Sequence, residues 1–270
     1  MKPVLEISVA DAPRIFARLD RGLFEDAFDL NLVSAPSARS ASDLPRFALL
    51  RDDRAWALDI LSHPDWNPLV INYTRGSGAE RLKKAWLSKE LLKDALSFRK
   101  GERLSIVDGT GGLLSDATLI ATWGHRVTAF EQNPLLCFLG LEALDGLAEA
   151  GQKLDVEVHC APFSSSASLH SVRHRSEGNV DRVYLDPLYP SRPKDALGSK
   201  ELRIVAQLTS AQAQPSLDAM IEAAVSLSPS RIVVKRPQWE SLLRHDRLQV
   251  TSCEGKSTRF DVIHSRTEKR

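Results

Sequence analysis

From about residue 100, short runs of β-branched and aliphatic residues alternate with segments of helical spacing, and this alternation limits the fold more than any other feature. The predicted strands are Leu104–Asp108, Arg126–Glu131, Val156–Cys160, Arg182–Asp186, Arg231–Lys235, Leu248–Ser252 and Phe260–His264. The predicted helices lie at about Ser115–Trp123, Pro134–Ala150 and Gln214–Leu227. Repeated strand–helix units predict a parallel sheet with helices on both faces.

Two local signals refine this α/β prediction. Asn133 can cap a helix whose first position is Pro134, which suits a helix start. Only residues 253–258 separate the last two strands, too few for a helical crossover, so the sheet should end in an antiparallel hairpin.

Residues 1–99 are more irregular than residues 100–270, and we interpret them as a small α+β region associated with the substrate. Short strands are expected at Val4–Val9, Phe47–Leu50 and Leu69–Tyr73. The stretch Ala79–Ser97 carries apolar residues at helical spacing among lysines. This spacing predicts one amphipathic helix whose basic face is free to meet a partner.

Composition favours a globular cytoplasmic protein. Hydrophobic residues make up 43% of the 270 positions, which is ample for a buried core. The longest apolar runs are far too short to cross a bilayer, and the first residues do not form a secretory signal. Cys137, Cys160 and Cys253 lie far apart without metal-ligand or disulfide spacing, so a reducing cytoplasm and no metal are expected.

The first strand of the core leads into a glycine-rich turn, Asp108-Gly109-Thr110-Gly111-Gly112-Leu113. Ligands of open α/β sheets bind at the carboxyl ends of strands, and glycine lets the backbone approach a ligand closely. Asp108 could offer its carboxylate to a cationic amino acid group. Leu114 stands where a dinucleotide-binding turn has its last glycine, which disfavours a pyrophosphate. The alternative interpretation is that these glycines only form a turn and bind no cofactor.

The second strand ends in Glu131, about 20 residues after the glycine turn. A carboxylate at this place can accept hydrogen bonds from both hydroxyls of a ribose, although an exposed glutamate at a strand end is an alternative. Together with the turn, it predicts a cofactor with ribose and amino acid parts and no phosphate, such as S-adenosylmethionine.

The fourth strand ends in Asp186-Pro187-Leu188-Tyr189, which resembles the motif of amino-group methyltransferases. An exocyclic amine is a poor nucleophile because its lone pair is delocalised into the ring. Asp186 and the carbonyl of Pro187 could accept its two N–H bonds, align the nitrogen and stabilise the developing positive charge. Tyr189 offers a face for an unstacked base. A strand-ending turn with a packing aromatic is the alternative.

Several segments between residues 104 and 264 are similar to the RsmJ family, which methylates N2 of a guanosine in small-subunit (16S) ribosomal RNA. They are Tyr184–Pro190 with Lys194, Ala196-Leu197, Lys200-Glu201 and Arg203 after it, Arg231–Pro237, Arg259–Val262, Asp108–Leu113 with Asp116-Ala117, and Glu131–Pro134. The resemblance implies a Rossmann-like, seven-stranded class I methyltransferase core. Leu114 and Ser115 replace a glycine and an arginine of the family pattern, and the family's glycine-rich segment before the core is missing.

The resemblance and the motifs together give the expected sites. Catalytic roles are expected for Asp186, Pro187 and Tyr189. Cofactor contacts are expected from Asp108, Thr110, Gly111, Gly112, Ser115, Asp116, Glu131, Gln132 and Asp186, and from Ala161 and Pro162, which occupy the places of two family serines. Lys194, Lys200, Arg203, Lys235 and Arg236 could meet RNA phosphates, although ordinary surface ion pairing explains them equally well.

The expected activity is therefore methylation of a guanine N2 amine in small-subunit rRNA, free or within the small (30S) ribosomal subunit. Two alternatives stay open. The acceptor could be a DNA adenine or a protein glutamine amide, which are also planar amines. The chain could instead be a non-catalytic RNA-binding protein of ribosome assembly that retains the fold. A nicotinamide dehydrogenase is disfavoured because the phosphate-binding turn is missing.

Overall fold

The computed structural model describes residues 2–42, 44–51, 55–87, 89–175, 179–189, 200–209, 212–256 and 258–265. The chain divides into two compact units. The first comprises Met1–Gly78, Asn133–Gln152 and Pro190–Gln214, and the second comprises Ala79–Gln132, Lys153–Tyr189 and Pro215–Arg270. This partition differs from the predicted division into residues 1–99 and 100–270. The predicted domain boundary stays a prediction.

A mixed five-stranded sheet organises the described part of the first unit, in the order β2-β1-β3-β4-β5. Its strands are β1 (Val4–Ser8), β2 (Asp29–Val33), β3 (Arg46–Arg51), β4 (Trp56–Ile60) and β5 (Leu69–Val70), with helices α1 (Ala12–Arg18) and α2 (Arg21–Ala27) between β1 and β2. β1 runs parallel to β2 and β3, whereas β4 is antiparallel to both of its neighbours. The predicted strands at β1, β3 and β5 are confirmed, and the other four elements were not predicted.

Helix α6 (Pro134–Glu149) belongs to the first unit, where it packs on α2 and β4. It begins as predicted, because the Asn133 side chain accepts hydrogen bonds from the amides of Leu135 and Leu136. The amide nitrogen of the same side chain donates to the carbonyl of Leu208 in α8 (Lys200–Thr209). One capping residue therefore also ties two helices of the unit together.

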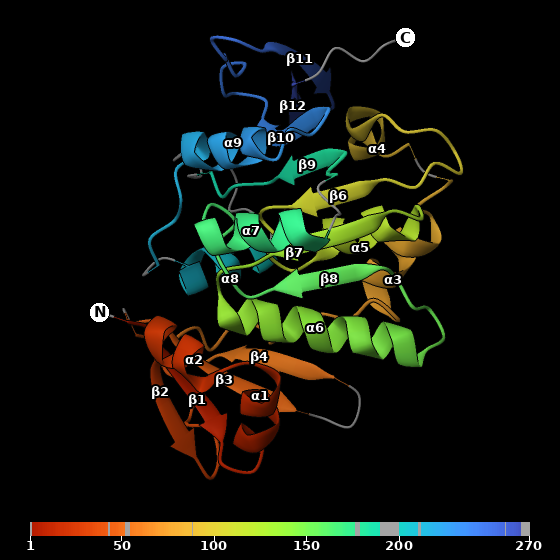
Figure 1. Cartoon of the computed structure of the whole chain (residues 1–270). Helices are drawn as coiled ribbons and strands as arrows, with labels where there is room; N and C mark the ends of the chain where they lie inside the picture. Colours follow the sequence, from red (N-terminus) through yellow and green to blue (C-terminus); the bar gives the residue numbers. More distant parts are fainter. Residues whose placement is uncertain are drawn as a thin grey trace. The chain divides into compact units, whose positions relative to one another are not determined.

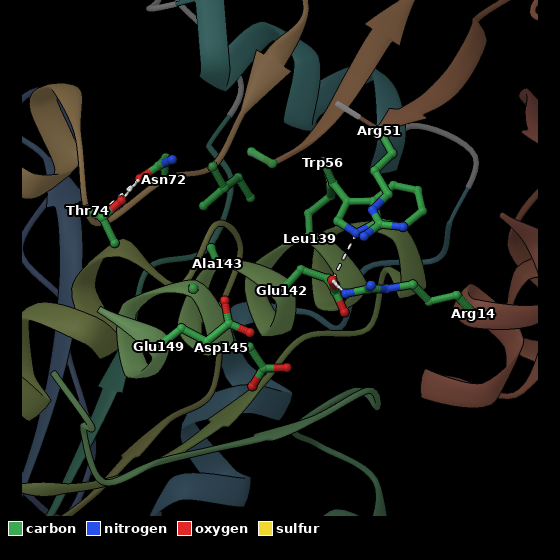
Figure 2. Close-up of a pocket in the computed structure, with 13 residues that line it drawn as sticks. Arg14, Arg51, Trp56, Asn72, Thr74, Leu139, Glu142, Ala143, Asp145 and Glu149 are labelled. Atoms are coloured by element: carbon green, nitrogen blue, oxygen red, sulfur yellow. Dashed lines mark hydrogen bonds and ion pairs between the residues drawn. The ribbon is translucent and has the colours of Figure 1, made fainter. Parts of the chain in front are cut away.

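A pocket of about 320 Å³ lies along α6 in this unit, and Figure 2 shows how its polar side chains are engaged. Trp56 Nε1 and Arg14 Nη2 both donate to Glu142 Oε2, at 2.9 and 2.8 Å (Figure 2). The Trp56 ring meets Phe138 edge-on, with centroids 5.0 Å apart. These contacts explain why an acidic residue is tolerated on the helix face that packs toward β4.

The second unit contains a seven-stranded sheet in its described part, in the order β11-β12-β10-β9-β6-β7-β8 (Figure 1). The strands are β6 (Ser105–Asp108), β7 (Arg126–Phe130), β8 (Val156–His159), β9 (Arg182–Leu185), β10 (Arg231–Pro237), β11 (Gln249–Glu254) and β12 (Thr258–His264). β6 to β10 are parallel, and β12 is antiparallel to β10 and β11. All seven predicted strands and the closing hairpin are confirmed.

The register of this sheet decides which residues can form a site. Asp108 of β6 lies opposite Tyr184 of β9, and Leu185 lies opposite Val234 of β10. The carboxyl ends of these parallel strands therefore share one edge, where Asp186, which follows β9, is brought beside Lys235 of β10.

Helices α5 (Ser115–Thr122), α7 (Ser166–Arg175) and α9 (Leu217–Ser226) connect the parallel strands within the second unit. Val107, Val183 and Ile232 of the sheet join Phe163 and Ala224 in one buried apolar cluster. The predicted helices at α5 and α9 are confirmed, and α7 was not predicted.

The single helix predicted over Ala79–Ser97 is wrong. The structure has two helices here, α3 (Gly76–Lys83) and α4 (Leu91–Leu96). Between them the amide of Leu87 donates to the carbonyl of Lys84. This bond spans three residues, as in a turn, whereas an α-helical bond spans four. Leu82 and Ala85 before the break and Leu92 after it are buried at helical spacing, so periodicity alone could not reveal the interruption.

Candidate active site

Three hydrogen bonds donated by backbone amides join the three predicted motifs at the carboxyl edge of the seven-stranded sheet. The Asp186 amide donates to Thr110 Oγ1 at 2.6 Å. The Gly112 amide donates to Glu131 Oε2, also at 2.6 Å. The Gly109 amide donates to the carbonyl of Tyr184 at 2.9 Å. The glycine turn is therefore fixed to the end of β7 on one side and to the end of β9 on the other.

Two of the glycines are required by this geometry. A Cβ on Gly109 would lie 2.6 Å from Leu185 Cδ2 and 2.7 Å from Phe163 Cδ1, closer than packed carbon atoms approach. Gly112 has a φ of +52°, in the left-handed region where a side chain is strained. The turn can therefore pass close to β9 and still direct its amides toward Glu131.

Asp108 is the most deeply buried carboxylate of the site, with 1% of its surface exposed. Its Oδ1 accepts a hydrogen bond from the Thr110 amide at 3.0 Å. Burial, reinforced by the nearby charges of Asp116, Asp186 and Glu131, raises the pKa of Asp108 to about 8 despite that hydrogen bond. Four carboxyl groups thus meet at one edge, and a cation placed beside Asp108 would relieve the repulsion among them.

Asp116, in the first turn of α5, is held by three side chains. Arg81 Nη1 donates to its Oδ1 at 2.8 Å, and Tyr184 Oη donates to its Oδ2 at 2.7 Å. Lys235 Nζ lies 3.6 Å from the same Oδ2. Burial acts to raise the pKa of Asp116, but Lys235 and Arg81 outweigh it and the pKa is lowered. Asp116 therefore stays ionised at the centre of this network.

The contributions of Arg81 and Tyr184 to the network were not predicted. For Tyr184 a signal existed, since a phenol within an apolar strand must find a hydrogen-bond partner when it is buried. For Arg81 the sequence showed only one basic residue among many in a lysine-rich stretch.

Asp186 is partly buried and holds one ion pair. Lys235 Nζ donates to its Oδ2 at 2.6 Å. Burial, with the charge of Asp116, raises the pKa of Asp186 although Lys235 acts in the opposite direction. Among the residues that the structure describes, none donates a hydrogen bond to the other carboxylate oxygen, Oδ1. That oxygen is available to a ligand.

The remaining predicted cofactor contacts differ in what they can offer. Gln132 Nε2 is buried and bonds to no acceptor in the described part of the chain. Ser115 is exposed at the start of α5. Ala161 and Pro162 have no side-chain polar groups, and the Pro162 carbonyl accepts from Ser168 Oγ at 2.8 Å. Their cofactor roles stay predictions.

Tyr189, predicted as a base-stacking face, already carries a cation on its ring. The guanidinium carbon of Arg236 lies 5.3 Å from the ring centroid, and Arg236 Nη2 also donates to Glu240 Oε2 at 3.0 Å. Burial raises the pKa of Tyr189. Arg236 is itself buried, so its surroundings do not favour the predicted phosphate contact.

The other predicted RNA contacts belong to both units. Lys235 is at the site but is paired with Asp186. Arg203, in the first unit, stacks on the Trp66 ring at 4.6 Å. Lys200 begins α8, and Lys194 lies outside the described residues. Each of these RNA contacts stays a prediction.

Comparisons with known proteins agree with this geometry. A family model for SAM-dependent methyltransferases matches residues 37–265. A protein from Shewanella loihica named Ribosomal RNA small subunit methyltransferase J is 33% identical over 225 residues, covering 80% of this chain and 82% of that protein. The protein of the same name from Tolumonas auensis is 32% identical over 218 residues, covering 80% and 85%. The chain belongs to the family of SAM-dependent methyltransferases that includes these two proteins.

The methyltransferase has S-adenosylmethionine as its cofactor, and its fold is the predicted Rossmann-like, seven-stranded one. The crystal structure of a SAM-dependent methyltransferase from Neisseria gonorrhoeae shares that fold with a TM-score of 0.65, at 23% identity, over 97% of this chain and 95% of that one.

Two further properties concern the described segments of the methyltransferase. None of their helices combines the length and apolar character needed to span a membrane. No three His, Cys, Asp or Glu side chains in these same segments come together as possible ligands of a metal ion.

Proposed function

We propose that this enzyme transfers the methyl group of S-adenosylmethionine to the N2 exocyclic amine of a guanosine in small-subunit rRNA. The observation that carries the proposal is the hydrogen bond from the Asp186 amide to Thr110 Oγ1, which fixes the acceptor motif directly beside the cofactor turn. The name of the relatives from Shewanella and Tolumonas supports the choice of RNA.

The residues at this edge fit the cofactor. Asp108, whose pKa burial raises to about 8, would gain from a methionine ammonium group beside it. Glu131, fixed by the Gly112 amide, would receive the ribose hydroxyls, and Gln132 Nε2, which has no acceptor among the described residues, would donate to the cofactor. The bound cofactor supplies an activated methyl group on a sulfonium, so the protein has only to align and stabilise.

The acceptor amine would be held by Asp186 and Pro187. Asp186 Oδ1 accepts one N–H bond and the Pro187 carbonyl accepts the other, so the nitrogen points its lone pair at the methyl group. The negative charge of Asp186 would stabilise the positive charge that develops on nitrogen as the carbon–nitrogen bond forms and the carbon–sulfur bond breaks, and the methylated nitrogen would then lose one proton to water. Tyr189 lies two residues further along, where its ring edge could border the base.

Methyl incorporation from labelled S-adenosylmethionine tests the proposal directly. The wild-type enzyme is incubated with 30S subunits, naked small-subunit rRNA, DNA and ribosomal proteins, and the product nucleoside is identified by chromatography. We expect N2-methylguanosine from rRNA or from 30S subunits. Label in adenine or in glutamine would instead support an alternative acceptor. Failure to bind S-adenosylmethionine in calorimetry would favour the non-catalytic assembly protein.

We further propose that the enzyme works in the cytoplasm, with rRNA or the 30S subunit as its partner. Mapping the modified position in rRNA from cells that lack the protein tests this part. Loss of one N2-methylguanosine, restored by the wild-type gene alone, is the expected result.

A further inference from the structure

A basic pocket of about 320 Å³ lies in the second unit, beside the ion pair of Asp186 and Lys235. Helix α4 packs against β11 and β12, and the pocket is formed where the segment before α4 meets the turn between those strands. Its charged lining residues are Arg81, Lys89, Glu90, Asp116, Lys235 and Lys256. Lys89 belongs to the stretch Ala79–Ser97, whose basic face was expected to be free to meet a partner, and no specific role was predicted for Lys256.

The charges of this basic pocket are not balanced. Of its described lining side chains, four are basic and two are acidic. Arg81 lies 2.8 Å from Asp116 and 3.5 Å from Glu90, so it uses both carboxylates. Lys235 is paired with Asp186. Lys89 and Lys256 are exposed, and neither forms an ion pair with a carboxylate of the described segments. Two ammonium groups are thus available to an anion.

The position of the pocket restricts what that anion can be. Lys235 and Asp116 line the pocket, and Lys235 Nζ is also hydrogen-bonded to the carboxylate proposed to hold the target amine. A base held by Asp186 stays attached to its sugar and to the phosphates on either side. Those phosphates must therefore lie close to Asp186, and lysine is a common ligand of a phosphodiester oxygen.

We propose that the basic pocket binds a backbone phosphate of the substrate RNA beside the target nucleotide, with Lys89 and Lys256 as its contacts. The inference rests on the proposed RNA methyltransferase function. It assigns substrate recognition to two elements of the catalytic unit itself, the segment before α4 and the β11–β12 turn.

The test compares the full-length variant K89A/K256A with a matched control, K100A/K153A. Lys100 and Lys153 are also exposed, but they precede β6 and β8 and so lie at the opposite, amino edge of the same sheet. Affinity for a small-subunit rRNA transcript is measured across a range of salt concentrations. For K89A/K256A we expect weaker binding and a log–log salt dependence shallower by about 0.7 for each phosphate that the variant no longer neutralises.

The control should keep the wild-type slope, and K89R/K256R should retain most of the affinity because both charges remain. All variants should bind S-adenosylmethionine with wild-type affinity in calorimetry. If the wild-type enzyme methylates an RNA for which K89A/K256A keeps the wild-type salt slope, that result overturns the role of the pocket and leaves the proposed function intact. If K89A/K256A loses cofactor affinity instead, the pocket holds the cofactor carboxylate and the proposal is overturned. If the wild-type enzyme methylates no RNA, the proposed function fails and this inference fails with it.

Discussion

Lys235 Nζ donates to Asp186 Oδ2 at 2.6 Å, which joins the end of β10 to the end of β9. Lysine was expected here as a phosphate contact, but its ammonium group is directed at a carboxylate. The pairing occupies one oxygen of Asp186 and leaves the other for the acceptor amine. It also partly offsets the repulsion between Asp186 and Asp116.

Replacing Lys235 by Met should move the acidic limb of the rate profile to higher pH. Burial and Asp116 raise the pKa of Asp186, and Lys235 opposes them, so its removal raises that pKa further. Because the carboxylate must be ionised to hold the amine, kcat then increases with pH over a higher range. The measurement is kcat against pH, and K235R should stay near the wild-type profile. If the acidic limb of the kcat–pH profile is unchanged in K235M, Lys235 does not influence the ionisation of Asp186.

Replacing Asp186 by Ala should leave the fold intact and lower turnover by about 100-fold or more, as loss of an aligned charge-stabilising group does. The amide that bonds Thr110 is retained in this variant, so cofactor affinity should change less than kcat. Single-turnover methylation and calorimetry with S-adenosylmethionine separate the two quantities. Unchanged activity would remove Asp186 from the mechanism.

Replacing Asp108 by Asn should stabilise the protein at alkaline pH while it weakens cofactor binding. The folded-state pKa of about 8 lies above the value of an exposed aspartate, about 4. Ionisation therefore opposes folding increasingly as pH rises from about 4 to 8, and the neutral amide avoids this penalty. We expect the difference in Tm between D108N and wild type to grow between pH 5 and pH 8. A difference that is constant with pH would contradict the pKa.

Replacing Glu131 by Ala should lower affinity for S-adenosylmethionine by about 10- to 100-fold, since hydrogen bonds to a charged group contribute about 1.5–3 kcal/mol. The change also releases the Gly112 amide, which donates to Glu131 at 2.6 Å. E131Q keeps an oxygen for that amide but loses the charge, so it should bind with intermediate affinity. Calorimetric titration of both variants provides the comparison.

Replacing Gly109 by Ala should destabilise the protein by about 1–3 kcal/mol, the usual effect of overpacking a core. The new Cβ would lie 2.6 Å from Leu185 Cδ2. Gly146 in α6 is the matched control, because apart from its chain neighbours and its own helix backbone no atom of the described residues lies within 4 Å of its would-be Cβ, and alanine is the better helix former. Urea denaturation should therefore show opposite signs for G109A and G146A.

The central strands β6, β9 and β10 of the seven-stranded sheet could be predicted because they are mainly apolar runs that are buried in the unit they form. Ile106, Val183 and Ile232 are fully buried, and runs of this kind are recognisable without knowledge of their neighbours. Among the elements that were missed in the first unit, α8 has ten residues, and α1, α2, β2 and β4 have only five to seven. Seven residues are fewer than the window of about 11 in which helical periodicity is recognised, and β2 is mostly exposed and lacks a buried apolar run.

The motifs of the candidate site could be predicted, but the ion pairs among its residues could not. Asp108 ends a strand, and Glu131 and Asp186 each follow one, so their place at one edge is a consequence of the sheet. Whether Lys235 points to RNA or to Asp186 depends on the register between β9 and β10, which only the folded sheet defines. The ion pair of Arg81 could not be predicted either, because its partner Asp116 is 35 residues away in the sequence.

The hydroxyl of Thr110 connects the two proposed halves of the site. Its loop is the proposed cofactor turn, and its oxygen accepts from the backbone amide of Asp186, the residue proposed to orient the acceptor. Donor and recipient geometry are therefore coupled through a single side chain. An engineer who wished to redirect this scaffold to another nucleophile would have to preserve that threonine or redesign both halves of the site together.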